Sequence, residues 1–434
     1  MYYLRFLSAL LIAFYLTIPG QQLAAQTNLS VSQPLQQRAN DVLRLFKAEP
    51  IENQVFDENF RNAVPPPQFR ALTKQVVAQQ GEPLEIVEIQ PRNSSSATLK
   101  LRFEKSIATI NIDLERAEPY RISGLLLTGF EAAGETIEQV VAAIDALPGR
   151  QGVLVQALSA NTPPIAAIDQ NGRYAIASTF KLYILAELDR AIRAKERSWS
   201  DVVKLGPKSH PSGISQNWPA NSPVSLHTLA ILMISISDNS ATDTLIRIIG
   251  QKRLAEIVRT TGHSNPGQLD PFLMTRQAST LKMPVHSKRR KEYLTADRSS
   301  RRALLKQYDS ILTLDTLDSR VLTNKPNYID QLEWFASPAN IVRLLDYLRI
   351  NASAETRKIL AINPGIGQQV AQKWKYFGYK GGSEPGVLSY NFLLKSRSGQ
   401  DYAVSIHWNN NEQSLDEGKL LGLTTRLINL LVEN

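Results

Sequence analysis

The chain has 434 residues, of which 43% are hydrophobic and 21% charged, a composition ordinary for a globular protein with room for two domains. It contains no cysteine, which excludes disulfides and a lipoprotein attachment site. Its five histidines are scattered and no glycine-rich phosphate loop is present, so we expect no metal and no other cofactor.

The first 25 residues have the features of a secretory signal peptide. Arg5 is their only charged residue, residues 6–18 are apolar, and the following QQLAAQT places a cleavage site near Ala25. The alternative is an N-terminal membrane anchor, although the apolar run is short for a span. We therefore expect a mature protein that is periplasmic or secreted and has no transmembrane span.

Residues 28–130 predict a small α+β domain. Helices are expected over 33–48, 55–60 and 68–78, from the spacing of apolar residues and the intervening prolines. The period then changes to the alternation typical of antiparallel strands. Four strands are expected, over 84–90, 97–104, 107–115 and 120–129. No catalytic constellation stands out in this part, and GFEAAGE at 129–135 has the composition of a linker.

Residues 136–434 predict a second domain with strands at both of its ends. A helix is expected over 136–147, followed by a strand pair at 152–158 and 165–171. The middle is helical, and SRSGQ at 396–400 joins two alternating runs into a hairpin before a final helix. The two ends are expected to form one antiparallel sheet with helices packed on it.

Positive charge is concentrated in residues 282–302. The formal net charge is +9, or +8 without Arg5, and this segment holds eight basic and two acidic side chains, hence +6 of that total. It is either a solvated basic helix or loop, or a surface that attracts an anionic substrate or an acidic envelope polymer. Nucleic acid is not expected as a partner of an exported chain. The basic residues are Lys282, Lys288, Arg289, Arg290, Lys291, Arg298, Arg301 and Arg302.

A lysine on the apolar stripe of AIASTFKLYILAEL, residues 175–188, calls for explanation. Lys181 follows Ser178 by three residues, so on a helix both side chains share a face. One interpretation is a lysine whose ammonium reaches solvent at a helix end. The other is a serine nucleophile beside the group that takes its proton. The pattern alone is weak, because STLK at 279–282 repeats it, although Met283-Pro284 prevents that copy from continuing a helix.

Two further motifs favour the interpretation of Ser178 as a nucleophile. SDN at 237–239 begins 59 positions after Ser178, and KGG at 380–382 lies in a strand-like run that leads into SEPG. In order and spacing, the three elements resemble Ser-x-x-Lys, Ser-Asp-Asn and Lys-Thr/Ser-Gly of serine β-lactamases and penicillin-binding proteins, especially class A β-lactamases. With the preceding small domain, of cystatin or nuclear-transport-factor (NTF2) type, the layout resembles two-domain β-lactamase-like proteins of clavulanic acid biosynthesis clusters. The resemblance implies a five-stranded antiparallel sheet with helices and a helical subdomain.

The resemblance also implies a role for each matching residue. Ser178 would be acylated, Lys181 would take its proton, Ser237 would relay a proton to the leaving group, and Lys380 would attract the substrate carboxylate. Burial and the nearby Lys380 would lower the pKa of Lys181. The remaining implied roles concern substrate binding: Asn239 holds Lys181 and a substrate amide, Gly382 admits substrate close to its strand, and the Ser383 backbone N–H completes an oxyanion hole with that of Ser178. Helix capping is the alternative explanation for Asn239.

The sequence departs from the family pattern in two places. No Glu-x-x-x-Asn of the kind that activates deacylating water precedes Ser337, and Glu333 is too close to Ser337 to match it. Gly381 also stands where a hydroxyl residue is usual, and Ser383 is a candidate replacement. We therefore expect a serine hydrolase acylated by anionic small molecules, β-lactams or related esters and amides, that deacylates slowly. The alternatives are a peptidoglycan DD-peptidase and a non-catalytic envelope-binding protein on the same fold.

Overall fold

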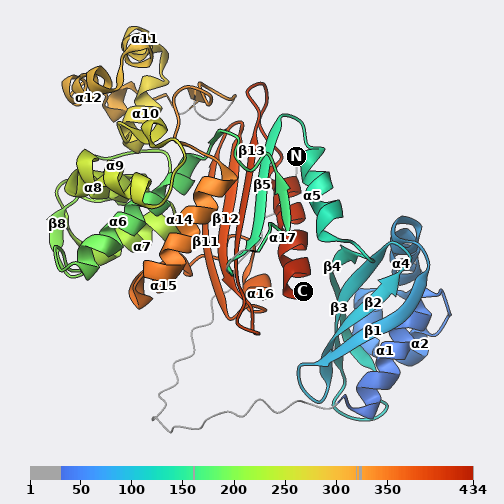
Figure 1. Cartoon of the computed structure of the whole chain (residues 1–434). Coiled ribbons are helices and arrows are strands. Elements are labelled where there is room, and N and C mark those ends of the chain that lie inside the picture. Colours follow the sequence, from blue (N-terminus) through green and yellow to red (C-terminus); the bar gives the residue numbers. More distant parts are fainter. Residues whose placement is uncertain (1–30, 160–161, 319, 322–324, 434) are drawn as a thin grey trace. The chain divides into compact units, whose positions relative to one another are not determined.

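A computed structural model describes residues 31–159, 162–318, 320–321 and 325–433 of the chain, so the expected signal peptide lies outside the described residues. The chain divides into two compact units, Met1–Gly134 and Glu135–Asn434 (Figure 1). No helix in the described part of the chain is long and apolar enough to cross a membrane.

The first unit packs helices against a curled antiparallel sheet. The helices are α1 (Gln33–Phe46), α2 (Glu52–Val55), α3 (Glu58–Ala63) and α4 (Pro66–Gln80), and the strands are β1 (Pro83–Pro91), β2 (Ser96–Phe103), β3 (Ser106–Leu114) and β4 (Ile122–Ala132). The sheet order is β1-β2-β3-β4, and one side of β2 and β3 alternates into the core as the sequence predicts. The helix expected over 55–60 is wrong: the Asp57 carboxylate accepts from the Phe60 N–H at 2.7 Å and starts α3 instead.

The second unit is built on the five-stranded antiparallel sheet that the sequence predicts. Its order is β11-β12-β13-β5-β6, so the last three strands of the chain join the first two of the unit. The bounds are β5 (Arg150–Ala157), β6 (Ala166–Ile168), β11 (Tyr376–Glu384), β12 (Val387–Lys395) and β13 (Asp401–Asn409). Two further strand pairs lie outside this sheet: β7 (Tyr174–Ala175) with β10 (Phe335–Ala336), and β8 (Val202–Lys204) with β9 (Pro223–Ser225).

Helices cover both faces of this sheet because its strands are apolar on both sides. On one face α5 (Ile137–Asp145) and α17 (Glu417–Glu433) pack on residues such as Val155 and Phe392 (Figure 1). On the other face Leu154 and Leu393 belong to the core of the helical part. That part comprises α6 (Lys181–Arg193), α7 (Leu226–Ser235), α8 (Asn239–Ile249), α9 (Gln251–Thr260), α10 (Thr275–Leu281), α11 (Ser287–Thr295), α12 (Arg298–Gln307), α14 (Pro338–Asn351), α15 (Ala354–Leu360) and α16 (Gln368–Ala371).

The basic segment forms α11 and α12 and uses part of its charge internally. The Arg290 guanidinium donates to the Leu281 and Met283 carbonyls at 2.9 and 3.0 Å. Arg302 forms an ion pair with Asp270, and Lys282 is buried at the end of α10. The segment is therefore neither wholly solvated nor wholly available to a partner.

Candidate active site

Ser178 lies in a single 3₁₀ turn between β7 and α6. The turn, η1, covers Ala177–Phe180, and Lys181 is the first residue of α6. Ala177 has φ of +41°, a left-handed conformation that costs an alanine about 1 kcal/mol. Phe180 anchors the turn by stacking on Trp334 at 3.9 Å between ring centroids. Within the described residues the Ser178 hydroxyl makes no hydrogen bond, and Ser178 is the one partly exposed residue of this turn.

Buried polar groups on strand β12 hold the serine turn in place through hydrogen bonds. The Thr179 hydroxyl lies 2.9 Å from the Ser389 hydroxyl and accepts from the Asn391 amide at 2.9 Å. Ser389 in turn contacts Nδ1 of His407 at 2.9 Å. Burial lowers the pKa of His407 to about 3, so its imidazole is neutral at physiological pH. These bonds fix the residue after Ser178 and hence the direction of the Ser178 side chain.

Lys181 is fully buried and hydrogen-bonded rather than extended to solvent. Its Nζ donates to the Ser237 carbonyl at 2.7 Å, the Ser237 hydroxyl at 3.0 Å and Oδ1 of Asn239 at 2.7 Å. Burial and then the Lys380 charge lower the pKa of Lys181 well below its usual value. The sequence predicted both causes. Three donated bonds use every N–H of the ammonium form. A neutral amine donates only two and directs its lone pair at the Ser237 hydroxyl, the one partner of the three that can donate, so Lys181 can accept a proton at this position.

Asp238 organises the turn that presents Ser237. Its carboxylate caps α8 through the Ala241 N–H at 2.9 Å, and it also accepts from the Ile214 and Ser215 N–H groups, both at 2.8 Å. Ser237, just before it, has φ of +59°. A serine in this left-handed conformation is strained, and the buried Asp238 contacts hold it there.

Asn239 is not the cap of α8, so that explanation for it is wrong. The capping side chain belongs to Asp238. The Asn239 amide instead accepts from Lys181 and donates to the His210 carbonyl at 3.1 Å. Its contact with Lys181 is the one expected from the family pattern.

Lys380 joins the same group from strand β11. Its Nζ lies 3.1 Å from the Ser237 hydroxyl, which is therefore between the two lysine nitrogens. Burial lowers the pKa of Lys380 to about 7. The Ser237 hydroxyl thus connects two amines that each lose a proton more readily than an exposed lysine, which is suited to passing a proton between them.

Gly382 allows β11 to lie directly against the serine turn. A Cβ at this position would be 2.3 Å from the Ile176 carbonyl oxygen and 2.6 Å from the Ser178 nitrogen, both backbone atoms. The backbones of β11 and η1 can approach this closely only with glycine here. Ser383 follows Gly382 in the strand and lines the same space as Ser178.

We expect Gly382→Ala to lower the melting temperature by about 2–10 °C. Forcing a methyl group into a packed site costs about 1–3 kcal/mol, and each kcal/mol shifts Tm by a few degrees in a unit of this size. Differential scanning calorimetry measures the change. Gly422→Ala in α17 is the matched control, because a Cβ there meets nothing within 4 Å. Equal melting temperatures for wild type and Gly382→Ala would contradict the close approach.

Tyr379 explains why residue 381 is glycine. A Cβ on Gly381 would lie 2.0 Å from the Tyr379 hydroxyl oxygen, so the phenol occupies the space of a side chain at 381. Burial raises the pKa of Tyr379, which keeps the phenol protonated and able to donate. A hydroxyl group therefore does lie near the position where the family pattern has one, but it comes from two residues earlier in the strand.

Ser178 borders two cavities. The Lys380 cavity, about 260 Å³, is lined by Ser237, Tyr379, Lys380 and Glu417 among others. The Glu333 cavity, about 310 Å³, is lined by Asn239, Glu333 and further residues of the helical part. The nucleophile candidate is thus a lining residue of both cavities. Within the described residues no cluster of His, Asp or Glu side chains suited to a metal ion is found.

A buried ion cluster lies in the wall of the Glu333 cavity, and the sequence did not indicate it. Lys282 Nζ lies 2.6 Å from Oε1 of Glu333 and 2.9 Å from both oxygens of Glu384. The three residues come from the end of α10, the segment before β10, and the end of β11. Glu333, dismissed from its distance to Ser337, lines the same cavity as Ser178. Lys282 belongs to the second Ser-x-x-Lys copy, so that copy contributes its lysine to an ion cluster.

Comparison with known proteins identifies relatives of the second unit. A family model described as the β-lactamase enzyme family matches residues 134–428. Similar solved structures include a β-lactamase from Sphaerobacter thermophilus, with 20% identity, a TM-score of 0.46, and coverage of 68% of this chain and 94% of that one. A β-lactamase from Chitinophaga pinensis has 14% identity, a TM-score of 0.46, and coverage of 68% and 97%.

A penicillin-binding protein also appears among the similar structures. It is a mutant of PBP-A in an acyl-enzyme complex with penicillin G, with 14% identity, a TM-score of 0.46, and coverage of 68% of this chain and 94% of that one. No protein with a curated description matches the chain.

Proposed function

Since the chain belongs to the β-lactamase enzyme family, a family of serine hydrolases, we propose that it is an exported enzyme acylated at Ser178 by β-lactams or related esters and amides. The observation that carries the proposal is the Ser237 hydroxyl held between Lys181 and Lys380, in a cavity that Ser178 borders. A binding protein would have little use for two buried lysines with lowered pKa values. Export rests on the leader-like sequence of residues 1–25 alone.

Acylation follows from the roles of these groups. Neutral Lys181 takes the proton of the Ser178 hydroxyl, and Oγ attacks the carbonyl carbon of the substrate. The N–H groups of Ser178 and Ser383 stabilise the developing oxyanion. Ser237 then passes a proton to the leaving nitrogen or oxygen and is reprotonated from the lysine pair. The Lys380 ammonium and the Tyr379 hydroxyl bind the anionic end of the substrate.

Deacylation is proposed to be slow at neutral pH. The sequence lacks the Glu-x-x-x-Asn pattern of the related enzymes. An acyl group on Ser178 therefore has no water-activating residue at the usual position. The protein would resemble a penicillin-binding protein in keeping its acyl group for longer than an efficient β-lactamase does.

Intact-protein mass spectrometry tests the proposal. The purified protein is incubated with benzylpenicillin, a cephalosporin and a chromogenic ester, and hydrolysis of each is followed in parallel. A mass increase equal to the whole β-lactam, located to Ser178 by peptide mapping, is the expected result. Absence of any adduct together with absence of hydrolysis would refute the proposal. A peptidoglycan stem-peptide assay distinguishes a DD-peptidase, which would release D-alanine.

The rate of acylation by an anionic β-lactam is expected to fall as pH rises above about 7. The pKa of Lys380 is about 7, so its ammonium is present below this pH and lost above it, together with its attraction for the substrate carboxylate. Well above the pKa, the rate should fall about tenfold per pH unit. Stopped-flow kinetics from pH 5 to 9 measure this limb. The Lys380→Arg variant keeps its positive charge over the whole pH range, so its acylation rate should not fall above about pH 7. An unchanged fall in this variant would show that another group causes the pH dependence.

A further inference from the structure

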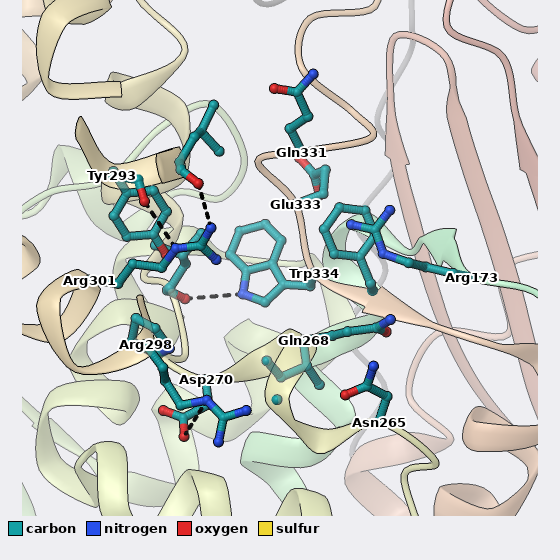
Figure 2. A pocket seen from close by; sticks show the side chains of 16 residues that line it. Arg173, Asn265, Gln268, Asp270, Tyr293, Arg298, Arg301, Gln331, Glu333 and Trp334 are labelled. Carbon is teal, nitrogen blue, oxygen red and sulfur yellow. Dashed lines mark hydrogen bonds and ion pairs between the residues drawn. The ribbon is translucent and has the colours of Figure 1, made fainter. Parts of the chain in front are cut away.

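A cavity beside Trp334 lies outside the candidate active site. Its volume is about 480 Å³, within the range of roughly 300–1,000 Å³ that ligand pockets have, and we call it the Trp334 cavity. Figure 2 shows Trp334 in the middle of its lining, with Arg298 and Arg301 on one side in this view and Arg173 on the other. Ser178 is not part of this lining. The cavity is therefore a separate candidate site for a ligand.

The two carboxylates of the Trp334 cavity are balanced by cations from outside its lining. Asp270 is buried and forms an ion pair with Arg302. Glu333 lies 2.6 Å from Nζ of Lys282. Neither Arg302 nor Lys282 lines the cavity, so a ligand would meet acidic groups whose charge is already compensated.

Three arginines of the cavity lack a close carboxylate partner. In the described part of the chain Arg173 and Arg301 form no ion pair and donate instead to backbone carbonyl groups, at 2.8 to 3.0 Å. Arg298 makes no hydrogen bond to a described residue and approaches Asp270 only to 3.8 Å. Arg298 and Arg301 belong to the basic segment 282–302, so part of its charge lines this cavity. The unmatched guanidinium groups favour an anionic ligand, because arginine binds carboxylate and phosphate through two parallel N–H groups.

Neutral polar groups of the cavity are also free to bind a ligand. Tyr293 is only 4% exposed, but its hydroxyl makes no hydrogen bond to a described residue and is not sealed from solvent. A buried phenol usually has a partner. Burial raises the pKa of Tyr293 to about 12, so the hydroxyl keeps its proton and can donate. Three amides of the lining likewise have no side-chain partner among the described residues: Asn265, Gln268 and Gln331.

These free groups match the hydroxyl groups of a sugar. An amide offers donors and an acceptor, and a hydroxyl group offers both as well, so the two can pair in either direction. Trp334 and Phe335 add aromatic surface between the polar groups. A peptide is usually held along a strand edge or in an apolar groove, whereas the free groups of this cavity are guanidinium, amide and phenol groups.

The same kind of lining continues into a neighbouring cavity. This second cavity, of about 380 Å³, adjoins the Trp334 cavity at Arg173 and Phe335, which line both. The Arg173 guanidinium lies over the Phe335 ring, 3.4 Å from its centroid. Arg150 and Asn411 also line the second cavity. Arginine, aromatic and amide groups thus extend beyond one cavity, which suits a chain of sugar units.

We propose that the Trp334 cavity binds a carboxylate-bearing saccharide, an oligomer that contains sugar acids, through Arg298 and the Tyr293 hydroxyl. A carboxylate of the ligand accepts from the Arg298 guanidinium, and its hydroxyl groups pair with Tyr293 and the free amides. The binding is non-covalent and goes beyond the proposed function, because it requires neither Ser178 nor an acyl group. The carboxylate is either part of a uronic acid or part of a lactyl ether on the sugar.

Isothermal titration calorimetry of the purified protein tests the proposal with trigalacturonate, N-acetylmuramic acid, uncharged maltotriose and glucose 6-phosphate. Trigalacturonate is expected to bind saturably and at least about tenfold more tightly than maltotriose, since a hydrogen bond to a charged group contributes this much. Binding of N-acetylmuramic acid instead would also support the proposal and identify a lactyl ether as the source of the carboxylate. Absence of binding by both acidic sugars, equal binding of maltotriose, or tighter binding of glucose 6-phosphate would overturn it.

The Arg298→Gln and Tyr293→Phe variants locate the ligand. Neither change breaks a hydrogen bond between described side chains, so both variants should fold, and thermal melting checks this. Each is expected to weaken binding of the acidic sugar at least about fivefold. Unchanged binding in either folded variant would overturn the proposal.

Lys288→Gln is the matched control for the loss of charge. It removes one positive charge from the same basic segment, at an exposed residue that does not line the cavity. At about 0.15 M salt, where exposed charges are largely screened, its affinity for the acidic sugar should stay within about twofold of wild type. A loss equal to that in Arg298→Gln would show that the sugar is attracted by the net charge of the segment and would overturn the proposed site.

Discussion

Replacing Ser178 by alanine is expected to abolish the covalent adduct with benzylpenicillin completely, because the proposed nucleophile is then absent from the two cavities that it borders. The fold should be unaffected, since the Ser178 hydroxyl makes no hydrogen bond to a described residue and its loss leaves no partner unsatisfied. Intact-protein mass spectrometry and thermal melting measure the two effects.

Ser279→Ala is the matched control for this change, because it alters the serine of the second Ser-x-x-Lys copy. Ser279 donates to the Thr275 carbonyl at 2.9 Å within α10, and its lysine partner is engaged with carboxylates. Adduct formation should therefore persist in Ser279→Ala. An adduct that persists in Ser178→Ala and is lost in Ser279→Ala would show that Ser279, and not Ser178, is the nucleophile.

Replacing Lys181 by methionine is expected to slow acylation about 10²–10⁴-fold, the usual contribution of a positioned general base. Methionine keeps the apolar stem and shape but cannot accept a proton. Stopped-flow acylation with a chromogenic cephalosporin measures the loss. Acylation at the wild-type rate would show that another group takes the Ser178 proton. Lys252→Met, an exposed lysine on α9, is the control and should leave the rate unchanged.

The same substitution should leave the protein as stable as wild type or nearly so. The pKa of Lys181 is lower in the folded protein than in the unfolded chain, so folding at neutral pH must dehydrate or deprotonate this amine, and the penalty diminishes as pH rises. Methionine removes that penalty but leaves the Ser237 carbonyl and the Asn239 amide without a donor. Because the two effects on stability oppose each other, we expect little net change in stability. A loss of acylation in this variant would then not be due to unfolding.

The sequence was sufficient to predict that the two ends of the second unit form one antiparallel sheet and to identify the motif residues, because each prediction rests on a local pattern. Alternating strands at both ends of the second unit predicted a sheet made from distant segments, and the three motifs predicted a common site. The structure joins Lys181, Ser237 and Lys380 there by hydrogen bonds, and Ser178 borders the same cavity. The catalytic and binding roles assigned to these residues remain predictions.

Other features depend on contacts that no spacing encodes. Glu333 and Glu384 meet at Lys282 from segments 51 and 102 positions away, so no local pattern joins them. The Tyr379 hydroxyl fills the space of a side chain at 381 only because both residues lie on one face of β11. The break in the predicted helix 55–60 came from a competing cap, Asp57, whose preference outweighed the apolar spacing.

The contact between Tyr379 and Gly381 limits the routes by which this site can change over evolutionary time. A threonine at 381, as the family pattern has, would collide with the phenol at once, so that substitution is not open while Tyr379 remains. Shortening Tyr379 first would leave an intermediate with neither hydroxyl. Conversion to the common motif thus requires both changes together, and descendants of this protein are expected to retain the tyrosine and the glycine as a pair or to lose both.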